Sequence, residues 1–303
     1  MKHAPRNLAA SVLAKLANIA GQSEEGYNLL LVRFVAERLL FRLASSEHTE
    51  SFVLKGAMLF LLWGSNPHRP TRDIDLLGFG EPDAERLAGI FRFLCAASLP
   101  DDGVNFEAES VIAEEIRALD QYGGIRVTLR AKIGNAQIPM QIDVGFGDAM
   151  TPAPTLVSYP TILDFPAPRL RAYGRETVVA EKIEAIAKFG MINTRFKDYF
   201  DLRELAESQP FDGALIQKVI RATFQRSGTL LPTSMPIGLT DTFAEDATKQ
   251  RQWTAFCSKI NTSRAKEPLR SAIKVIASFV GPPMTSPGRD PFVQMWAPGG
   301  PWK

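Results

Sequence analysis

Two aspartates separated by one residue, Asp73 and Asp75, are the side chains whose types and spacing most directly suggest chemistry. Successive side chains on a strand point to opposite faces, so both carboxylates would share one face while Ile74 and Leu76 enter a core. Close carboxylates repel each other unless a cation lies between them. Mg²⁺ (or Mn²⁺) suits the pair, because its shell takes one or two carboxylates and leaves positions for water and phosphates. The pair predicts a metal-dependent nucleotide site, although a lone Asp-x-Asp is more often a solvated turn.

A third carboxylate, Asp143, lies in the segment QIDVGF, where Ile142, Val144 and Phe146 would take one face of a strand and Asp143 the other. Taken alone, Asp143 would be interpreted as a strand-edge residue that faces water. Three acidic residues on two adjacent strands would instead complete a two-metal site. One ion would activate an attacking oxygen, and the other would neutralise a leaving pyrophosphate.

Phosphate contacts are predicted next to the carboxylate pair. Gly56 precedes a short apolar segment that begins at Ala57, so a helix N-terminus with free backbone N–H groups would cradle a triphosphate. Lys55 would assist this cradle. Thr71 would have its hydroxyl on the same side as the aspartates, where it would contact phosphate or cap a turn.

Further candidates lie in the second half of the chain. Lys182 borders the apolar face of a predicted helix, where a structural lysine that extends along the core is the simpler interpretation. Arg195, Asp198 and Asp201 follow at i, i+3 spacings, which surface ion pairing explains equally well. Basic residues nevertheless gather around the predicted site and suit phosphates of a nucleotide or an RNA backbone: Arg69, Arg72, Arg126, Arg130, Lys132, Arg171, Arg175, Lys188, Arg195 and Lys197.

Hydrophobic periodicity predicts the elements that position these residues. Two amphipathic helices come first, and a short strand, a glycine turn, a short helix and the carboxylate strand follow. A further helix, three alternating strands and a proline-rich linkage then lead to a helical region. We expect an N-terminal part over 1–165, a helical domain over 166–280 and a Pro/Gly-rich tail over 281–303 that Phe292, Met295 and Trp296 would anchor. The predicted helices cover residues 8–20, 27–44, 57–63, 84–97, 177–188, 196–207 and 212–224, and the predicted strands cover 52–54, 73–79, 104–112, 125–133 and 138–146.

Composition sets the outer limits of the interpretation. The 303 residues are 45% hydrophobic with a net charge of +2, so bulk charge does not indicate a nucleic-acid binder. Cys95 and Cys257 match no zinc or redox spacing and are interpreted as buried thiols in a reducing cytoplasm. The N-terminus lacks a secretion signal, and the longest apolar run, 57–63, is too short to cross a membrane. The three histidines have no spacing typical of zinc sites or catalytic triads.

Five segments in this order resemble one family, the AbiEii/AbiGii nucleotidyltransferase toxins. The resemblance runs from the N-terminal helices to about residue 279. It implies an α+β fold of the DNA polymerase β-like nucleotidyltransferase superfamily, with a small mixed β-sheet domain flanked by N-terminal helices and a helical C-terminal domain. One departure is that Lys55-Gly56-Ala57 stands where the superfamily usually has a Gly-Ser pair. The segments are FVLKGA from 52, RPTRDIDL from 69, QIDVGFGD from 141, AEK from 180 and KDYFDL from 197.

The resemblance also implies an activity and partners. Asp73 and Asp75 would bind metal, Lys182 would contact the triphosphate, and Asp198 would complete the active site, with Asp201 also eligible. Asp143 matches the third strand carboxylate of the superfamily. The chain would transfer a nucleotide from an NTP to RNA, with the tRNA 3′ end as the acceptor, and would have a cognate antitoxin. The alternatives are transfer to a small molecule or to a protein hydroxyl, and a protein that binds a nucleotide or a partner without catalysis.

Overall fold

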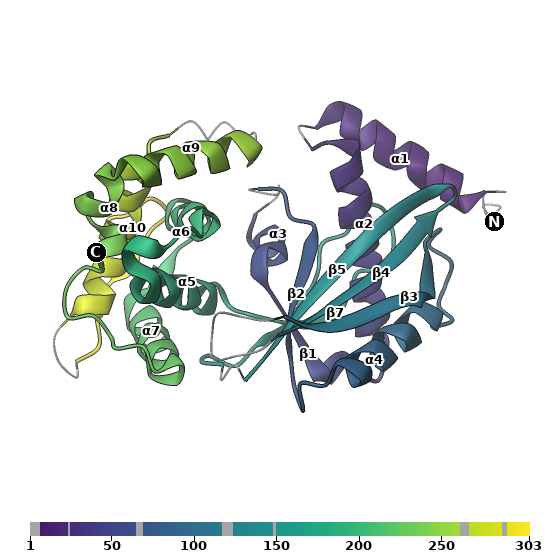
Figure 1. Cartoon of the computed structure of the whole chain (residues 1–303), viewed down its shortest axis with the longest axis horizontal. Coiled ribbons are helices and arrows are strands. Elements are labelled where there is room, and N and C mark those ends of the chain that lie inside the picture. Colours follow the sequence, from purple (N-terminus) through teal and green to yellow (C-terminus); the bar gives the residue numbers. More distant parts are fainter. Residues whose placement is uncertain are drawn as a thin grey trace. The chain divides into compact units, whose positions relative to one another are not determined.

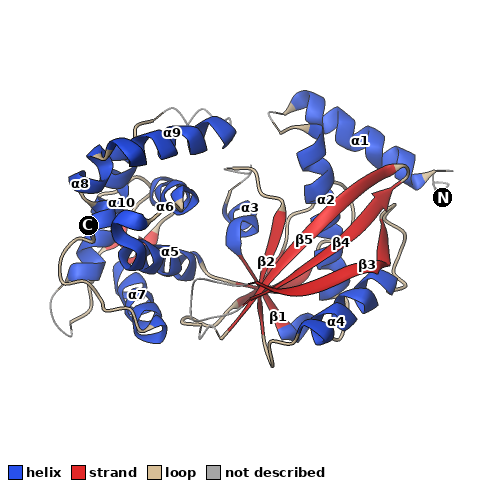
Figure 2. Ribbon diagram, in the orientation of Figure 1, coloured by secondary structure: helices blue, strands red, loops and turns tan. Residues whose placement is uncertain are grey.

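A computed structural model describes residues 7–23, 25–64, 69–116, 124–147, 150–260, 267–286 and 290–303. The chain divides into two compact units (Figure 1). The first contains the described residues of 1–148 together with 155–173, and the second contains those of 149–154 together with 174–303. Residues 166–173, which we assigned from the sequence to the second domain, therefore lie in the first unit. Strands dominate the first unit and helices the second (Figure 2), so the expected α+β architecture is confirmed.

A seven-stranded mixed sheet forms the first unit, in the order β3-β4-β5-β2-β1-β7-β6. β2 pairs in parallel with β5, β1 pairs in parallel with β7, and the other neighbours are antiparallel. The alternation in β5 buries every second residue, as the sequence predicts for a strand with one core face. The strands are β1 (Phe52–Lys55), β2 (Asp73–Gly78), β3 (Asn105–Ile116), β4 (Gly124–Ile133), β5 (Ala136–Phe146), β6 (Thr155–Ser158) and β7 (Arg169–Ala172).

Helices α2 and α4 pack on the apolar face of this sheet. Phe91 of α4 contacts Phe52 of β1, and the guanidinium of Arg42 in α2 lies 4.5 Å from the ring centroid of Phe106 in β3. Arg42 is also paired with the buried carboxylate of Asp102, which satisfies both charges inside the unit. The helices of the first unit are α1 (Leu8–Gln22), α2 (Tyr27–Ala44), α3 (Phe60–Trp63) and α4 (Ala84–Ala96), with 3₁₀ turns over Thr49–Ser51 and Gly56–Leu59.

Three features of the first unit differ from the sequence predictions. The segment 57–63 does not form one α-helix, because a 3₁₀ turn precedes the short α3. The proline-rich linkage contains two strands, β6 and β7, of which β7 extends the sheet beside β1. Cys95 is also only partly buried, whereas Cys257 is buried as expected.

The second unit is a cluster of helices with one short two-stranded sheet of β8 (Phe211–Asp212) and β9 (Met295–Trp296). Asp212 caps α7 by accepting a hydrogen bond from the backbone N–H of Leu215, and Gly228 ends that helix in the left-handed conformation. The helices of this unit are α5 (Arg175–Phe189), α6 (Phe196–Ser208), α7 (Gly213–Ser227), α8 (Asp241–Glu245), α9 (Ala247–Ile260) and α10 (Leu269–Thr285), with 3₁₀ turns over Gly190–Ile192 and Ile237–Leu239.

The expected tail is more regular than its composition predicts. α10 continues through Pro282 and Pro283 to Thr285. Beyond it, Trp296 is 3% exposed and donates its indole N–H to the carbonyl of Ala206. Trp302 stacks on Phe279, with ring planes 10° apart, and donates to the carbonyl of Phe279. The tail is therefore anchored by an aromatic cluster that includes Trp302, a residue that the sequence analysis missed. Met295, which the sequence analysis included in the anchor, is 54% exposed. None of the described helices is long and apolar enough to cross a membrane.

Candidate active site

A row of charged residues crosses the polar face of the sheet in the first unit. Asp75 on β2 lies opposite Lys55 of β1 on one side and opposite Asp143 of β5 on the other. Asp143 in turn lies opposite Arg126 of β4. Asp73 lies two residues before Asp75 on β2, and its carboxylate therefore shares this face. The structure thus places the three predicted strand carboxylates on one face of two neighbouring strands.

Gly56 makes room for the carboxylate of Asp75. Its backbone has φ +75°, a conformation that L side chains rarely adopt, and a Cβ placed there would lie 1.9 Å from Oδ2 of Asp75. A glycine is therefore required at this position both by the backbone and by the carboxylate. The predicted phosphate cradle after Gly56 begins with a 3₁₀ turn rather than an α-helix.

Asp143 forms a bidentate ion pair within the sheet. Its two carboxylate oxygens accept hydrogen bonds from Nε and one terminal nitrogen of Arg126, each at 2.8 Å. The hydrogen bonds to Asp143 raise the pKa of Arg126, and the negative charges of Asp143 and Asp73 add to the increase. This pairing was not recognised from the sequence. The two-residue turn Gly134-Asn135 between β4 and β5 fixes the register that brings Arg126 and Asp143 together. This turn is visible in the sequence, so counting residues back from it would have predicted the pair.

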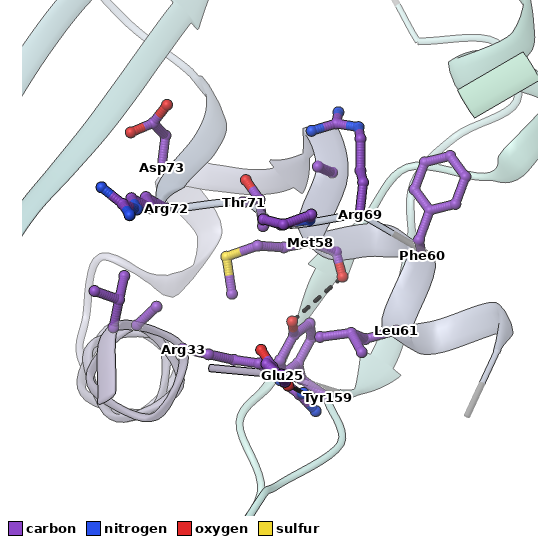
Figure 3. A pocket seen from close by; sticks show the side chains of 14 residues that line it. Glu25, Arg33, Met58, Phe60, Leu61, Arg69, Thr71, Arg72, Asp73 and Tyr159 are labelled. Carbon is purple, nitrogen blue, oxygen red and sulfur yellow. Dashed lines mark hydrogen bonds and ion pairs between the residues drawn. The ribbon is translucent and has the colours of Figure 1, made fainter. Parts of the chain in front are cut away.

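A pocket adjoins Asp73 on the first unit (Figure 3). Asp73 lies at one end, and Tyr159 lies at the other, where its hydroxyl donates a hydrogen bond to the carbonyl of Met58. Three residues of the predicted set line the pocket together with Asp73: Arg69, Thr71 and Arg72. The rest of the lining is mainly apolar, with Glu25, Arg33 and Tyr159 as the other polar residues, and the space open to water is only about 20 Å³, which is room for a water molecule and not for a nucleotide.

The metal prediction has partial geometric support. The side chains of Asp73 and Asp75 are partly exposed on one face, as a divalent cation with additional water and phosphate ligands requires. Within the described ranges, however, no group of three or more His, Cys, Asp or Glu side chains is arranged to hold a metal ion. Asp143 would have to exchange Arg126 for the metal before it could act as a third ligand.

The second unit contains a compact group of charged residues. Nζ of Lys182 on α5 lies 2.8 Å from Oδ1 of Asp198 and 2.8 Å from Oδ2 of Asp201. Both carboxylate side chains are fully buried, whereas Lys182 is 14% exposed. Nε of Arg195 contacts the other oxygen of Asp198 at 2.6 Å. The sequence analysis left Asp198 and Asp201 both eligible as partners in the site, and in the structure both contact the same lysine.

Asp198 remains ionised although it is buried. Burial alone raises the pKa of its carboxyl group, but the charges of Lys182 and Arg195 and their hydrogen bonds lower it, and the resulting pKa is below the usual value. Two cations and two anions therefore balance in this cluster, which we call the lysine cluster: Lys182, Arg195, Asp198 and Asp201.

The predicted basic residues do not form one cationic surface. Several are paired with acidic side chains: Arg126 with Asp143, Arg130 and Lys132 with Glu107, Arg171 with Glu50, and Arg175 with Glu176. Arg69 and Arg72 line the pocket next to Asp73. Lys197 is exposed at the start of α6.

Comparison with known proteins adds a family and a fold. The family model described as "Nucleotidyl transferase AbiEii toxin, Type IV TA system" matches residues 38–275. This chain is similar to the crystal structure of a candidate nucleotidyltransferase from Helicobacter pylori. The two share 15% sequence identity with a TM-score of 0.50, and the match covers 86% of this chain and 96% of that chain. JHP933 from Helicobacter pylori has 16% identity and a TM-score of 0.51, with 86% and 93% covered. No curated protein matches the chain.

Proposed function

Because the chain belongs to the AbiEii family of nucleotidyltransferase toxins, we propose that it transfers a nucleoside monophosphate from an NTP to RNA, with the 3′ end of tRNA as the acceptor. The chain is a nucleotidyltransferase, and its type IV toxin–antitoxin family implies an NTP donor and an antitoxin partner. A nucleotide added to the acceptor end would prevent aminoacylation and block translation. We place this reaction in the cytoplasm, where tRNA is charged and used.

The observation that carries the proposal is the position of Asp73 and Asp75 on one face of β2, with Gly56 leaving space for the carboxylate of Asp75. Transfer of a nucleotidyl group requires the triphosphate to be held against a divalent cation. A bound Mg²⁺ or Mn²⁺ would supply charge neutralisation at the phosphates. Asp73 and Asp75 would hold this ion, and Asp143 would join them if Arg126 released it.

We assign the remaining contacts to the predicted phosphate-binding residues. In the first unit, Lys55, the turn at Gly56 and Thr71 would orient the triphosphate. In the second unit, we assign Lys182, which lies 2.8 Å from both Asp198 and Asp201, to contact with a phosphate oxygen, with Arg195 beside it. The acceptor hydroxyl would lose its proton to solvent water, its oxygen would bond to the α-phosphorus, and the bond to pyrophosphate would break.

Incubation of the purified protein with total tRNA, Mg²⁺ and each α-³²P-labelled NTP in turn tests the proposal. We expect label on tRNA from one NTP, lost when the cation is chelated. Asp73→Asn should abolish labelling because it removes a ligand charge without changing side-chain size. Glu81→Gln, at an exposed acidic residue of the same unit, is the matched control and should retain labelling.

Each other outcome has a defined meaning. Labelling of a small molecule or of a protein hydroxyl, with none on RNA, would retain the transferase and replace the acceptor. Toxicity that persists in cells expressing Asp73→Asn would favour a binding protein that acts by sequestration. Labelling of tRNA by Asp73→Asn at the wild-type rate would refute the assigned metal site.

A further inference from the structure

An open groove lies within the second unit, between the first turn of α6 and one face of α9. A volume of about 470 Å³ is open to water there, which is within the range of about 300–1,000 Å³ typical of ligand sites. Phe196 forms part of its floor and is buried. The described residues that line the groove are Thr194, Arg195, Phe196, Lys197, Gln252, Ala255, Phe256 and Lys259.

The charge of the groove is of one sign. Arg195, Lys197 and Lys259 are exposed cations, and no acidic side chain is among its described lining residues. Asp198 lies on the buried side of α6 and contacts Arg195 from there. Arg195 therefore belongs both to the groove and to the lysine cluster, so the groove adjoins that cluster at Arg195.

The α9 side of the groove adds contacts that suit a nucleobase. Oε1 of Gln252 is buried and has no hydrogen-bond partner among the described residues, and such an unmet acceptor is costly unless a ligand donates to it. Phe256, one turn further along, contacts the rings of Phe200 and Trp253 but is partly exposed, and it lines the groove, where it offers an aromatic contact for a base. Gln252, Phe256 and Lys259 are spaced i, i+4 and i+7, so they share one face of the helix.

We propose that this groove binds a single-stranded segment of the RNA acceptor. Lys197 and Lys259 would contact backbone phosphates, Phe256 would stack on a base, and Gln252 would accept a hydrogen bond from a base N–H group. Cations alone would fit an acidic peptide equally well, but an aromatic ring next to an unmet amide acceptor favours a nucleobase. The inference rests on the proposed function for its choice of RNA as the ligand.

Fluorescence anisotropy with a short labelled single-stranded RNA, over a range of salt concentrations, tests the groove. Lys197→Gln with Lys259→Gln should reduce the slope of log affinity against log salt by about 1.4, since each phosphate contact on a single strand contributes about 0.7. At about 0.1 M salt the same arithmetic gives an affinity loss of roughly 25-fold. Lys218→Gln with Lys274→Gln, two exposed lysines of the same unit outside the groove, is the matched control and should change neither quantity.

The outcomes separate the groove from the transfer reaction. Equal effects of the two double variants, no effect of either, or no RNA binding by the wild-type chain would overturn the groove assignment. An equal loss of affinity for polyglutamate would overturn it in favour of an acidic protein partner. If the groove variant loses RNA affinity but the wild-type chain labels no RNA, the groove stands and the proposed transfer to RNA fails. If the wild-type chain labels RNA and the groove variant has an unchanged KM for RNA, only the groove assignment fails.

Discussion

Replacement of Lys182 by methionine is expected to destabilise the second unit by about 3–5 kcal/mol at pH 7, the usual cost of removing one partner from a buried ion pair. Methionine retains most of the apolar stem of the lysine, so the loss reports on the charge. The variant leaves the carboxylates of Asp198 and Asp201, both fully buried, without a cation that lies 2.8 Å from each. Arg195 still contacts Asp198, which keeps the loss below that of a wholly unpaired site.

The magnitude follows from the distances and the burial. A pair of unit charges 2.8 Å apart attracts by about 6 kcal/mol at an effective dielectric constant of about 20. Desolvation of the buried charges offsets much of this in the wild-type protein. In Lys182→Met that desolvation cost remains while the attraction is lost, so the net effect is several kcal/mol.

The effect should depend on pH in a defined direction. In the wild-type protein the pKa of Asp198 is lowered, so its stabilisation is present above the unfolded carboxyl pKa of about 4 and is lost as pH falls through the folded value. In Lys182→Met, the cation that most strongly opposes the effect of burial on the pKa of Asp198 is lost, and protonation relieves part of the cost as pH falls towards 5. The stability difference between the two proteins should therefore shrink from pH 7.5 to pH 5.

Urea unfolding followed by tryptophan fluorescence measures this difference. Three of the four tryptophans lie in the second unit, at positions 253, 296 and 302, so the signal reports mainly on that unit. A second variant, Lys182→Met with Asp201→Asn, removes one of the two buried negative charges. It should recover part of the stability that Lys182→Met loses, but not the activity. A loss below about 1 kcal/mol, or a loss that does not decrease at pH 5, would refute the reasoning.

Three further predictions concern other parts of the molecule. Gly56→Ala should lower the transfer rate by about 100-fold, because its Cβ would displace the carboxylate of Asp75. Gly228→Ala is the matched control: it also has a positive φ, of +69°, but open space around its Cβ, so it should strain the backbone without lowering the transfer rate. Burial raises the pKa of Glu37 from 4.5 to about 7. Between these pH values the folded state therefore binds more protons than the unfolded state, and the stability of the wild-type protein should fall by about 3 kcal/mol as pH rises. Glu37→Gln should abolish this dependence of stability on pH in unfolding curves followed by circular dichroism, and an unchanged dependence would contradict the assignment. Trp302→Ala should destabilise the second unit by roughly 2–3 kcal/mol, because it loses the stacking on Phe279 and the indole hydrogen bond. A midpoint of urea unfolding equal to the wild-type value would show that the aromatic cluster does not contribute to the stability of this unit.

Local patterns predicted the elements that bury a regular face. Residues 27–44 form α2 as expected, because its apolar positions repeat with helical spacing between Gly26 and Ser45. β5 was predicted by its strict alternation. The short strands β6 and β7 were missed, because prolines surround them and four residues are too few to show a period. The packing of Trp302 on Phe279 was also missed, since it joins residues far apart in the chain through contacts that no local pattern encodes.

The candidate site was predictable to a similar extent. The face shared by Asp73 and Asp75 follows from strand alternation alone. The sequence analysis expected Asp143 on an adjacent strand, but it could not derive that Asp143 lies directly opposite Asp75, because β2 and β5 are parallel and are joined through a long connection that leaves the register open. The pairing of Asp201 with Lys182 depends on how α6 packs against α5, which spacing within one helix does not determine.

The charged row on the sheet also constrains which strand alignments are possible. A slip of β2 by one residue against β5 would turn Asp73 and Asp75 into the apolar core and bring Ile74 and Leu76 to the polar face. Burial of two unpaired carboxylates costs several kcal/mol each, so such an alignment would not compete with the native one. Asp73 and Asp75, which we assign to catalysis, therefore also favour the native alignment of β2 against β5 during folding. Substitution of both aspartates by apolar residues would remove an activity and, at the same time, a barrier to misfolding.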